Sequence, residues 1–257
     1  MEFYYGTSWV WPIKYLPKVM ISASVPFIRG RKSKFEISKP WMMDSGIGQL
    51  WKEGNGRLSV EEYANLIIQH NPPVAWSYDY PCEPSIRNKF GYTSLQAQDM
   101  TNRNTELLRD KYGLKNVHNV IQGWELSEYL ENIDKIRESG LMTERLGIGS
   151  VCRRGETQKI LRIIKEVYRT VPGWVKLHGF GIKTTLLKTE AKYYLASADS
   201  QSWSLEAYYS RIINYELDKN TIDDKLPYLL NYVNKIERLI IEPNTYKLDQ
   251  YGILGDV

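Results

Sequence analysis

The chain has 257 residues, a length that suits one large domain or two small ones. Hydrophobic residues make up 42% and charged residues 25% of it, with a formal net charge of +4, and this balance excludes wholesale disorder, a collagen-like repeat and a coiled-coil rod. No stretch approaches the roughly 20 apolar residues that cross a bilayer, and the first residues lack a signal-peptide pattern. We therefore expect a cytoplasmic globular protein that makes no membrane contact.

Short apolar runs rich in β-branched and aromatic residues alternate with amphipathic segments along the chain. Several of these runs are almost continuously apolar, which is typical of parallel strands covered by helices. We expect eight strands, at residues 3–8, 18–24, 41–45, 74–79, 117–123, 145–151, 174–179 and 193–198.

Helices are predicted between the strands. Ser59 and Glu62 have the spacing of a capping box, which begins a helix running to about residue 69. Further helices are expected over 94–112, 127–139, 156–171 and 226–239. The alternation predicts parallel β/α units, and eight strands in this length favour a (β/α)8 TIM barrel. We expect the barrel domain over residues 1–203 and a helical C-terminal extension, packed on it, over residues 204–257.

Polar residues follow the apolar runs where the strands are expected to end. Asp44, Asp79 and Asp199 each come after such a run, and the ends of the strands meet at one mouth of a barrel. Paired carboxylates suit glycosyl transfer, in which one attacks the sugar while another moves a proton. They also suit a divalent metal ion. His178 stands at another strand end, where it serves either the core or a ligand.

Six short motifs at these strand ends carry a family resemblance. In their order and spacing they resemble the tRNA-guanine transglycosylase superfamily, and most closely its DNA-acting branch, the deazapurine-in-DNA transglycosylases (DpdA), over roughly residues 3–205. The motifs are Asp44-Ser-Gly-Ile-Gly-Gln49, Ser77-Tyr-Asp79, Val120-Ile-Gln122-Gly123, Gly147-Ile-Gly149-Ser150, Leu177-His-Gly-Phe-Gly181 and Ala198-Asp199-Ser200.

The resemblance implies a role for each matched residue. Asp199 is expected to attack the sugar C1′, and Asp44 to move a proton at the departing and the incoming base. Ser150 stands where the tRNA-acting enzymes usually have a second glycine. The expected substrate-binding residues are Ser45, Asp79, Gln122, Gly123, Gly149, Ser150 and His178.

The zinc module of the tRNA-acting enzymes is not matched. Those enzymes carry a Cys-x-Cys-x-x-Cys module with a histidine after the nucleophile strand, whereas this chain has only Cys82 and Cys152. A four-cysteine zinc site is therefore impossible and a disulfide framework is not expected. We expect no zinc-binding subdomain, no metal and no cofactor.

The resemblance implies an enzyme that replaces guanine in DNA with a 7-deazaguanine such as 7-cyano-7-deazaguanine, through a covalent Asp–sugar intermediate. Three alternatives stay open: a tRNA-guanine transglycosylase without the zinc module, a non-catalytic barrel that binds nucleic acid or a partner, and a metal-dependent hydrolase. The oligomeric state is also open, a homodimer included. The basic residues expected to hold phosphates are Arg29, Arg31, Lys32, Lys34, Arg153, Arg154 and Lys183.

Overall fold

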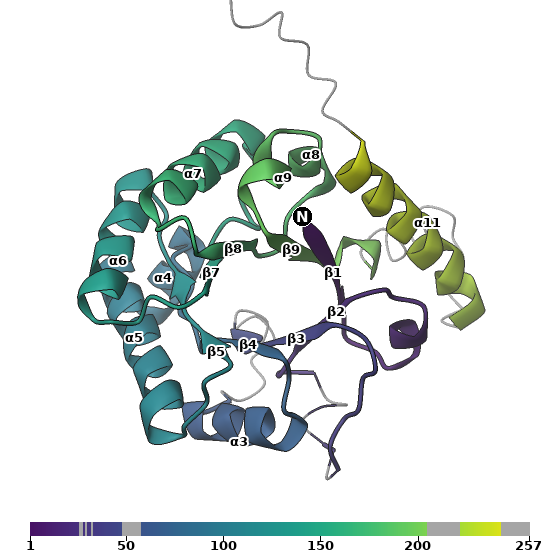
Figure 1. Ribbon diagram of the computed structural model, residues 1–257, viewed down its shortest axis with the longest axis horizontal. Coiled ribbons are helices and arrows are strands. Elements are labelled where there is room, and N and C mark those ends of the chain that lie inside the picture. The colour runs from purple at the N-terminus through teal and green to yellow at the C-terminus, as the bar shows by residue number, and fades with distance from the viewer. Residues whose placement is uncertain (26–27, 29, 32, 48–57, 205–221, 243–257) are drawn as a thin grey trace, which may run out of the picture.

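The computed structural model describes residues 1–25, 28, 30–31, 33–47, 58–204 and 222–242. Its described strands form one parallel sheet that curls almost into a ring, with the helices outside it (Figure 1). The strands are β1 (Glu2–Thr7), β2 (Val19–Ser22), β3 (Trp41–Asp44), β4 (Val74–Trp76), β5 (Val117–His118), β6 (Val120–Ile121), β7 (Arg145–Ile148), β8 (Lys176–Gly179) and β9 (Ser197–Ser200).

The sheet has nine strands rather than the predicted eight, in the order β5-β4-β3-β2-β1-β9-β8-β7-β6. The expected strand 117–123 is split at Asn119, because the side-chain oxygen of Asn119 accepts a hydrogen bond from the N–H of Val120 at 2.8 Å. The Asn119 carbonyl accepts from the N–H of Gly147 at 3.0 Å. Since Asn119 alone separates the two edge strands along the chain, the sheet is nearly closed and barrel-like.

The last strand was predicted too early. The expected strand at residues 193–198 is observed at Ser197–Ser200, and Tyr193 instead belongs to the short helix α9 (Ala191–Tyr194). The aromatic residues at the start of this segment favour a strand, but the chain forms one helical turn there. As a result Asp199 lies inside β9 rather than after it.

The predicted helices are observed close to their expected bounds. The side-chain oxygen of Ser59 accepts from the N–H of Glu62, and the Glu62 carboxylate accepts from the N–H of Ser59, which confirms the capping box. Four short helices were not predicted: η1 (Trp11–Lys14), α4 (Pro84–Phe90), α8 (Thr184–Leu187) and α9. The helices are η1 (Trp11–Lys14), α3 (Val60–His70), α4 (Pro84–Phe90), α5 (Ser94–Glu106) with its π-helical end η2 (Leu107–Lys111), α6 (Leu126–Glu138), α7 (Thr157–Thr170), α8 (Thr184–Leu187), α9 and α11 (Ile222–Ile241).

The interior of the ring is filled by an apolar cluster that is distinct from the main core between the sheet and the helices. The strands that contribute to this cluster also direct polar side chains to the same side of the sheet. Because side chains alternate across a strand, the residue two places after an interior residue points to the same side. Ser22, Asp44 and Gln122 stand in this position, at the carboxyl ends of their strands. The interior cluster is Tyr4, Met20, Met42, Val74, Trp76 and Val120.

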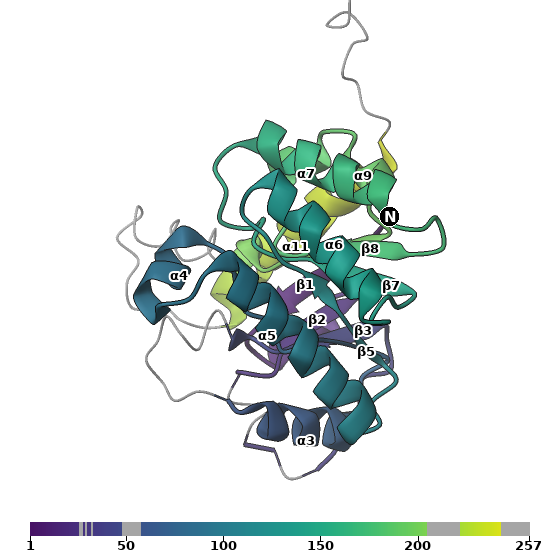
Figure 2. The same cartoon turned by 90° about the vertical axis from the view of Figure 1, so that its left-hand side faces the viewer.

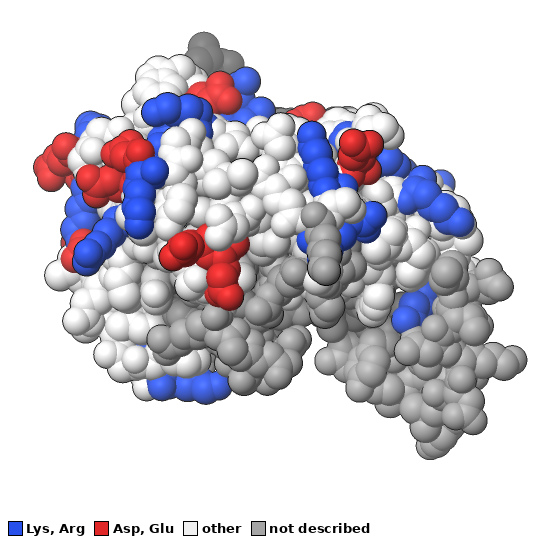
Figure 3. Space-filling view, turned by 90° about the horizontal axis from the view of Figure 1, so that it is seen from below, with Lys and Arg blue, Asp and Glu red and all other residues white. Residues whose placement is uncertain are grey.

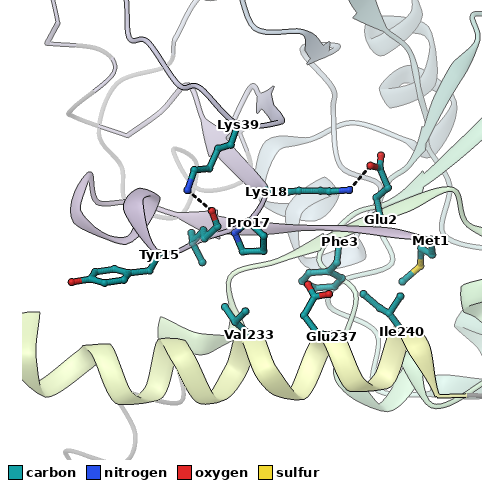
Figure 4. A pocket seen from close by; sticks show the side chains of 11 residues that line it. Met1, Glu2, Phe3, Tyr15, Pro17, Lys18, Lys39, Val233, Glu237 and Ile240 are labelled. Carbon is teal, nitrogen blue, oxygen red and sulfur yellow. Dashed lines mark hydrogen bonds and ion pairs between the residues drawn. The ribbon is translucent and has the colours of Figure 1, made fainter.

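Helix α11 packs on the outside of the ring next to β1 (Figure 1). The Tyr5 hydroxyl donates to Glu237 at 2.8 Å, and the buried Lys192 ammonium donates to the carbonyl of Leu239 at 2.9 Å. A hollow of about 500 Å³ separates α11 from the starts of β1 and β2, with Phe3 and Lys18 on its wall (Figure 4). Among the described helices, none is both long and apolar enough to cross a bilayer.

Candidate active site

A cavity of about 260 Å³ lies at the carboxyl ends of the strands. Its polar wall comes from strand ends and from the loops that follow them: Asp44 ends β3 and Ser45 follows it, Asp79 and Glu83 lie in the loop after β4, and Ser150 lies after β7. Helix α4 stands off one end of the sheet and follows directly on this wall (Figure 2). The structure thus brings residues from distant parts of the sequence to one cavity.

The Asp44 carboxyl group is set up to exchange a proton near neutral pH. Its Oδ1 is buried and has no hydrogen-bond partner among the described residues. Burial, and next the negative charge of Asp199, raise the pKa of Asp44 to about 7, although the Ser22 hydroxyl and the N–H of Gly46 act to lower it. Asp199 does not itself line the cavity, but its charge acts on Asp44. A pKa near the working pH is what a general acid–base catalyst needs.

Asp79 is held by two hydrogen bonds at the same cavity. The Ser45 hydroxyl donates to its Oδ1 at 3.2 Å and the Gln122 amide nitrogen donates to its Oδ2 at 2.6 Å. Burial raises the pKa of Asp79 to about 6, while both hydrogen bonds act to lower it. Within the described part of the chain, no three His, Cys, Asp or Glu side chains are grouped so as to hold a metal ion.

Ser150 adopts a backbone conformation that normally favours glycine, with a φ of +56°. Its hydroxyl accepts from the N–H of Cys82 at 2.7 Å, lies 2.8 Å from the Gln122 side-chain oxygen, and lies 3.0 Å from Oε2 of Glu83. Ser150 thus has a left-handed backbone at the position where the resemblance has a second glycine. Its hydroxyl adds a polar link from Gln122 to Glu83.

The two predicted glycines are required by close packing. A Cβ on Gly149 would lie 2.4 Å from the Gln122 amide nitrogen, and a Cβ on Gly123 would lie 2.8 Å from the Tyr129 ring. The Tyr129 hydroxyl also donates to the Gly149 carbonyl at 2.8 Å. Gly149 lines the cavity, whereas Gly123 packs against Tyr129 and does not line it.

Asp199 is oriented by a buried histidine. The Nε2 of His178 lies 3.2 Å from Oδ1 of Asp199, and the N–H of Gly181 donates to the same oxygen at 3.1 Å. Since an ionised carboxylate only accepts, Nε2 is the donor, while Nδ1 faces the Ser197 hydroxyl at 2.8 Å. His178 is fully buried and stacks on Trp76, so it contacts Asp199 rather than the cavity.

The basic residues expected after β7 and β8 divide into one without an ion pair among the described residues and two that are engaged. Arg153 lines the cavity, is exposed, and has no ion pair within the described ranges. Arg154 is buried, donates to the Ser150 carbonyl at 3.2 Å and lies over the Trp124 ring at 4.0 Å. Lys183 donates to the Arg154 carbonyl at 2.7 Å. Arg154 and Lys183 therefore hold the loop, and Arg153 remains available.

The described members of the other expected basic cluster, Arg31 and Lys34, do not line the cavity. The Arg31 carbonyl accepts from the Gln69 side chain at 2.6 Å, and Gln69 lies in the last turn of α3, close to the start of β4. Arg31 is therefore near the opposite end of the strands, and Lys34 is three residues further along. On the face that Figure 3 shows, basic side chains are interspersed with acidic ones. Arg29 and Lys32, like Gln49 of the first motif, lie outside the described residues.

Several cavity residues were not predicted as site residues. Glu83 gives the clearest missed signal, because it is an acidic residue in Pro81-Cys82-Glu83-Pro84, the loop that follows the predicted strand 74–79. Ser22 is the polar end of β2, but a single serine there is common in loops. Cys152 and Phe180 line the cavity too, and nothing in their sequence context separates them from core residues.

A parallel barrel-like sheet with a carboxylate-lined cavity at its strand ends is the arrangement of many α/β enzymes. The family model DpdA, described as DeoxyPurine in DNA protein A, matches residues 3–243. The match spans nearly the whole chain, and the chain belongs to the DpdA family, which is implicated in deazapurine modification of DNA. No curated protein matches the chain.

Proposed function

We propose that this chain is a base-exchanging transglycosylase that replaces guanine in DNA with a 7-deazaguanine derivative. One observation carries the proposal: the charge of Asp199, which His178 and Gly181 hold in place, acts together with burial to raise the pKa of Asp44 to about 7. Membership of the DpdA family supports DNA as the polymer. The fold is then a (β/α)8 barrel in which β5 and β6 count as one strand.

The first half of the reaction forms a covalent intermediate. An oxygen of Asp199 bonds to the sugar C1′ as the C1′–N9 bond breaks, and the electron pair of that bond goes to the departing guanine. Asp44 supplies the proton that this guanine takes up. Oδ2 of Asp199 is suited to the attack, because both hydrogen bonds that hold the carboxylate go to Oδ1.

The second half reverses these steps with a different base. The incoming 7-deazaguanine gives its N9 proton to the Asp44 carboxylate, and N9 displaces Asp199 from C1′. Two displacements at one carbon retain its configuration. No energy cofactor is needed, because one glycosidic bond is exchanged for another.

Base recognition falls to the polar chain on the cavity wall. The Asp79 carboxylate is suited to accept from the N1–H and the 2-amino group of a guanine-type base, and Gln122 fixes its orientation. The target nucleotide must leave its stack to reach this cavity, at a cost of a few kcal/mol. Arg153, free at the cavity edge, is placed to contact a phosphate beside the extruded nucleotide.

The test is base release from two polymers in parallel. DNA and tRNA, each with labelled guanine, are incubated with the protein and a 7-deazaguanine. We expect label release from DNA, little from tRNA, and none with Asp199→Asn. Release from tRNA alone would reassign the polymer, and release from neither polymer would contradict the proposed reaction.

A further inference from the structure

We propose that Glu83 recognises the substituent at position 7 of the incoming base, and that the site favours a positively charged substituent with N–H donors over a nitrile. Aminomethyl and amidino groups belong to the favoured class. This inference rests on the proposed function and adds the substrate class of the same cavity.

Glu83 is a buried carboxylate on the cavity wall, and the described residues provide no cation for it. Its residue is only 4% exposed, and within the described part of the chain no lysine, arginine or histidine lies within ion-pair distance of it. Glu83 precedes α4, yet its side chain does not cap that helix. Its carboxylate instead faces the Ser150 hydroxyl at 3.0 Å and the Cys152 thiol at 4.0 Å. A buried carboxylate is costly unless a donor or cation meets it.

The hydrogen atoms available at Ser150 leave one acceptor unmet. The Ser150 hydroxyl has a single proton but faces two acceptors, the Gln122 oxygen at 2.8 Å and Oε2 of Glu83 at 3.0 Å. Its oxygen already accepts from the N–H of Cys82 at 2.7 Å. Gln122 cannot offer a donor there, because its amide nitrogen bonds Asp79 at 2.6 Å. An N–H of a ligand would satisfy the remaining oxygen.

The order of side chains along the wall matches the order of groups along the base. The Gln122 amide nitrogen donates to Asp79, and the Ser150 hydroxyl lies between the Gln122 side-chain oxygen and Glu83. In a 7-deazaguanine the 2-amino group and N1–H come first, then O6, then the substituent on C7. With Asp79 at the amino edge, Glu83 meets the substituent. A carboxylate attracts an ammonium or amidinium group, whereas a nitrile nitrogen is itself only an acceptor.

Calorimetric titration of free bases tests the inference without requiring base exchange. The probes are 7-aminomethyl-7-deazaguanine, 7-cyano-7-deazaguanine and unsubstituted 7-deazaguanine, each titrated into wild type and Glu83→Gln at neutral pH. We expect wild type to bind the aminomethyl base at least about tenfold more tightly than the cyano base, as one charge-assisted contact implies. In Glu83→Gln this ratio should fall below about threefold, with little change for the unsubstituted base.

Two further variants separate recognition from a structural role. Glu83→Asp keeps the charge and should retain part of the preference for the aminomethyl base. Glu61→Gln, which removes an exposed charge in the first turn of α3, should leave all three affinities unchanged. Equal binding of the two substituted bases by wild type would overturn the inference, as would an equal loss for all three bases in Glu83→Gln. Failure of label release, with the binding preference intact, would instead contradict base exchange alone.

Discussion

The imidazole of His178 connects the interior of the barrel-like sheet to the carboxylate of Asp199. Nε2 lies 3.2 Å from Oδ1 of Asp199, and the ring stacks on Trp76 with the centroids 4.8 Å apart. Packing against Trp76 therefore fixes the position of the imidazole, and the contact with Asp199 makes Nε2 the nitrogen that donates. In the proposed reaction this contact keeps Oδ1 engaged and leaves Oδ2 for the sugar.

Replacing His178 with phenylalanine should slow base exchange and leave DNA binding intact. The ring stacking is kept, but the hydrogen bond to Asp199 is lost. We expect a decrease of about 10- to 100-fold in the single-turnover rate, the effect of losing one charge-assisted hydrogen bond. Affinity for DNA, measured by fluorescence anisotropy, should change little. An unchanged rate would show that Gly181 suffices to orient Asp199.

Two substitutions at Ser150 separate its backbone from its hydroxyl. Ser150→Ala removes the hydroxyl that meets Cys82 and Gln122 and should lower the free energy of unfolding by about 1–3 kcal/mol. Ser150→Gly loses the same contacts but suits the φ of +56°, so it should be more stable than the alanine variant by about 1 kcal/mol. Urea denaturation measures both, and an alanine variant as stable as the glycine one would contradict backbone strain.

Asp44→Asn should stabilise the protein in a pH-dependent way. The pKa of Asp44 is about 7 in the folded state against an ordinary value of 3.8, so between these values the folded state binds more protons than the unfolded state. Stability therefore falls as pH rises through this window. The asparagine variant escapes this loss and should gain about 1–3 kcal/mol at pH 8, with little gain at pH 4. A gain independent of pH, in denaturation at both values, would contradict the raised pKa.

Lys192→Met should loosen the end of α11. The Lys192 ammonium is buried and donates to the carbonyls of Leu239 and Glu242, which the helix itself leaves unpaired. The loss should cost about 1–3 kcal/mol and speed hydrogen exchange in the last turn of α11. Lys176→Met, at an exposed position on β8, serves as the control. Unchanged exchange in that turn would show that apolar packing alone holds the helix.

Much of the fold could be predicted because its signals are local. The capping box of Ser59 and Glu62 begins α3 where expected, and the apolar runs mark the strands. Asn119 splits a strand through its own side chain, an effect that apolar periodicity does not register. Tyr193 was assigned to a strand because aromatic residues favour strands, but the chain forms a helical turn there.

The site was predictable where a polar residue ends a strand, and less so elsewhere. Asp44 and Gln122 follow interior residues by two places, so the alternation of the strand directs them to the cavity. Glu83 reaches the same cavity from a loop, where no periodicity reveals direction. Arg154 looked like a phosphate ligand from its charge, but its guanidinium is occupied by backbone carbonyls and the Trp124 ring.

The most direct test of the proposed reaction is to find the covalent bond itself. Wild-type protein is incubated with guanine-containing DNA in the absence of a 7-deazaguanine, denatured, digested with protease and nuclease, and examined by mass spectrometry. We predict a deoxyribose-linked peptide with the mass addition on Asp199, and no adduct on any residue in Asp199→Asn. An adduct on another residue, or one that persists in Asp199→Asn, would contradict Asp199 as the nucleophile.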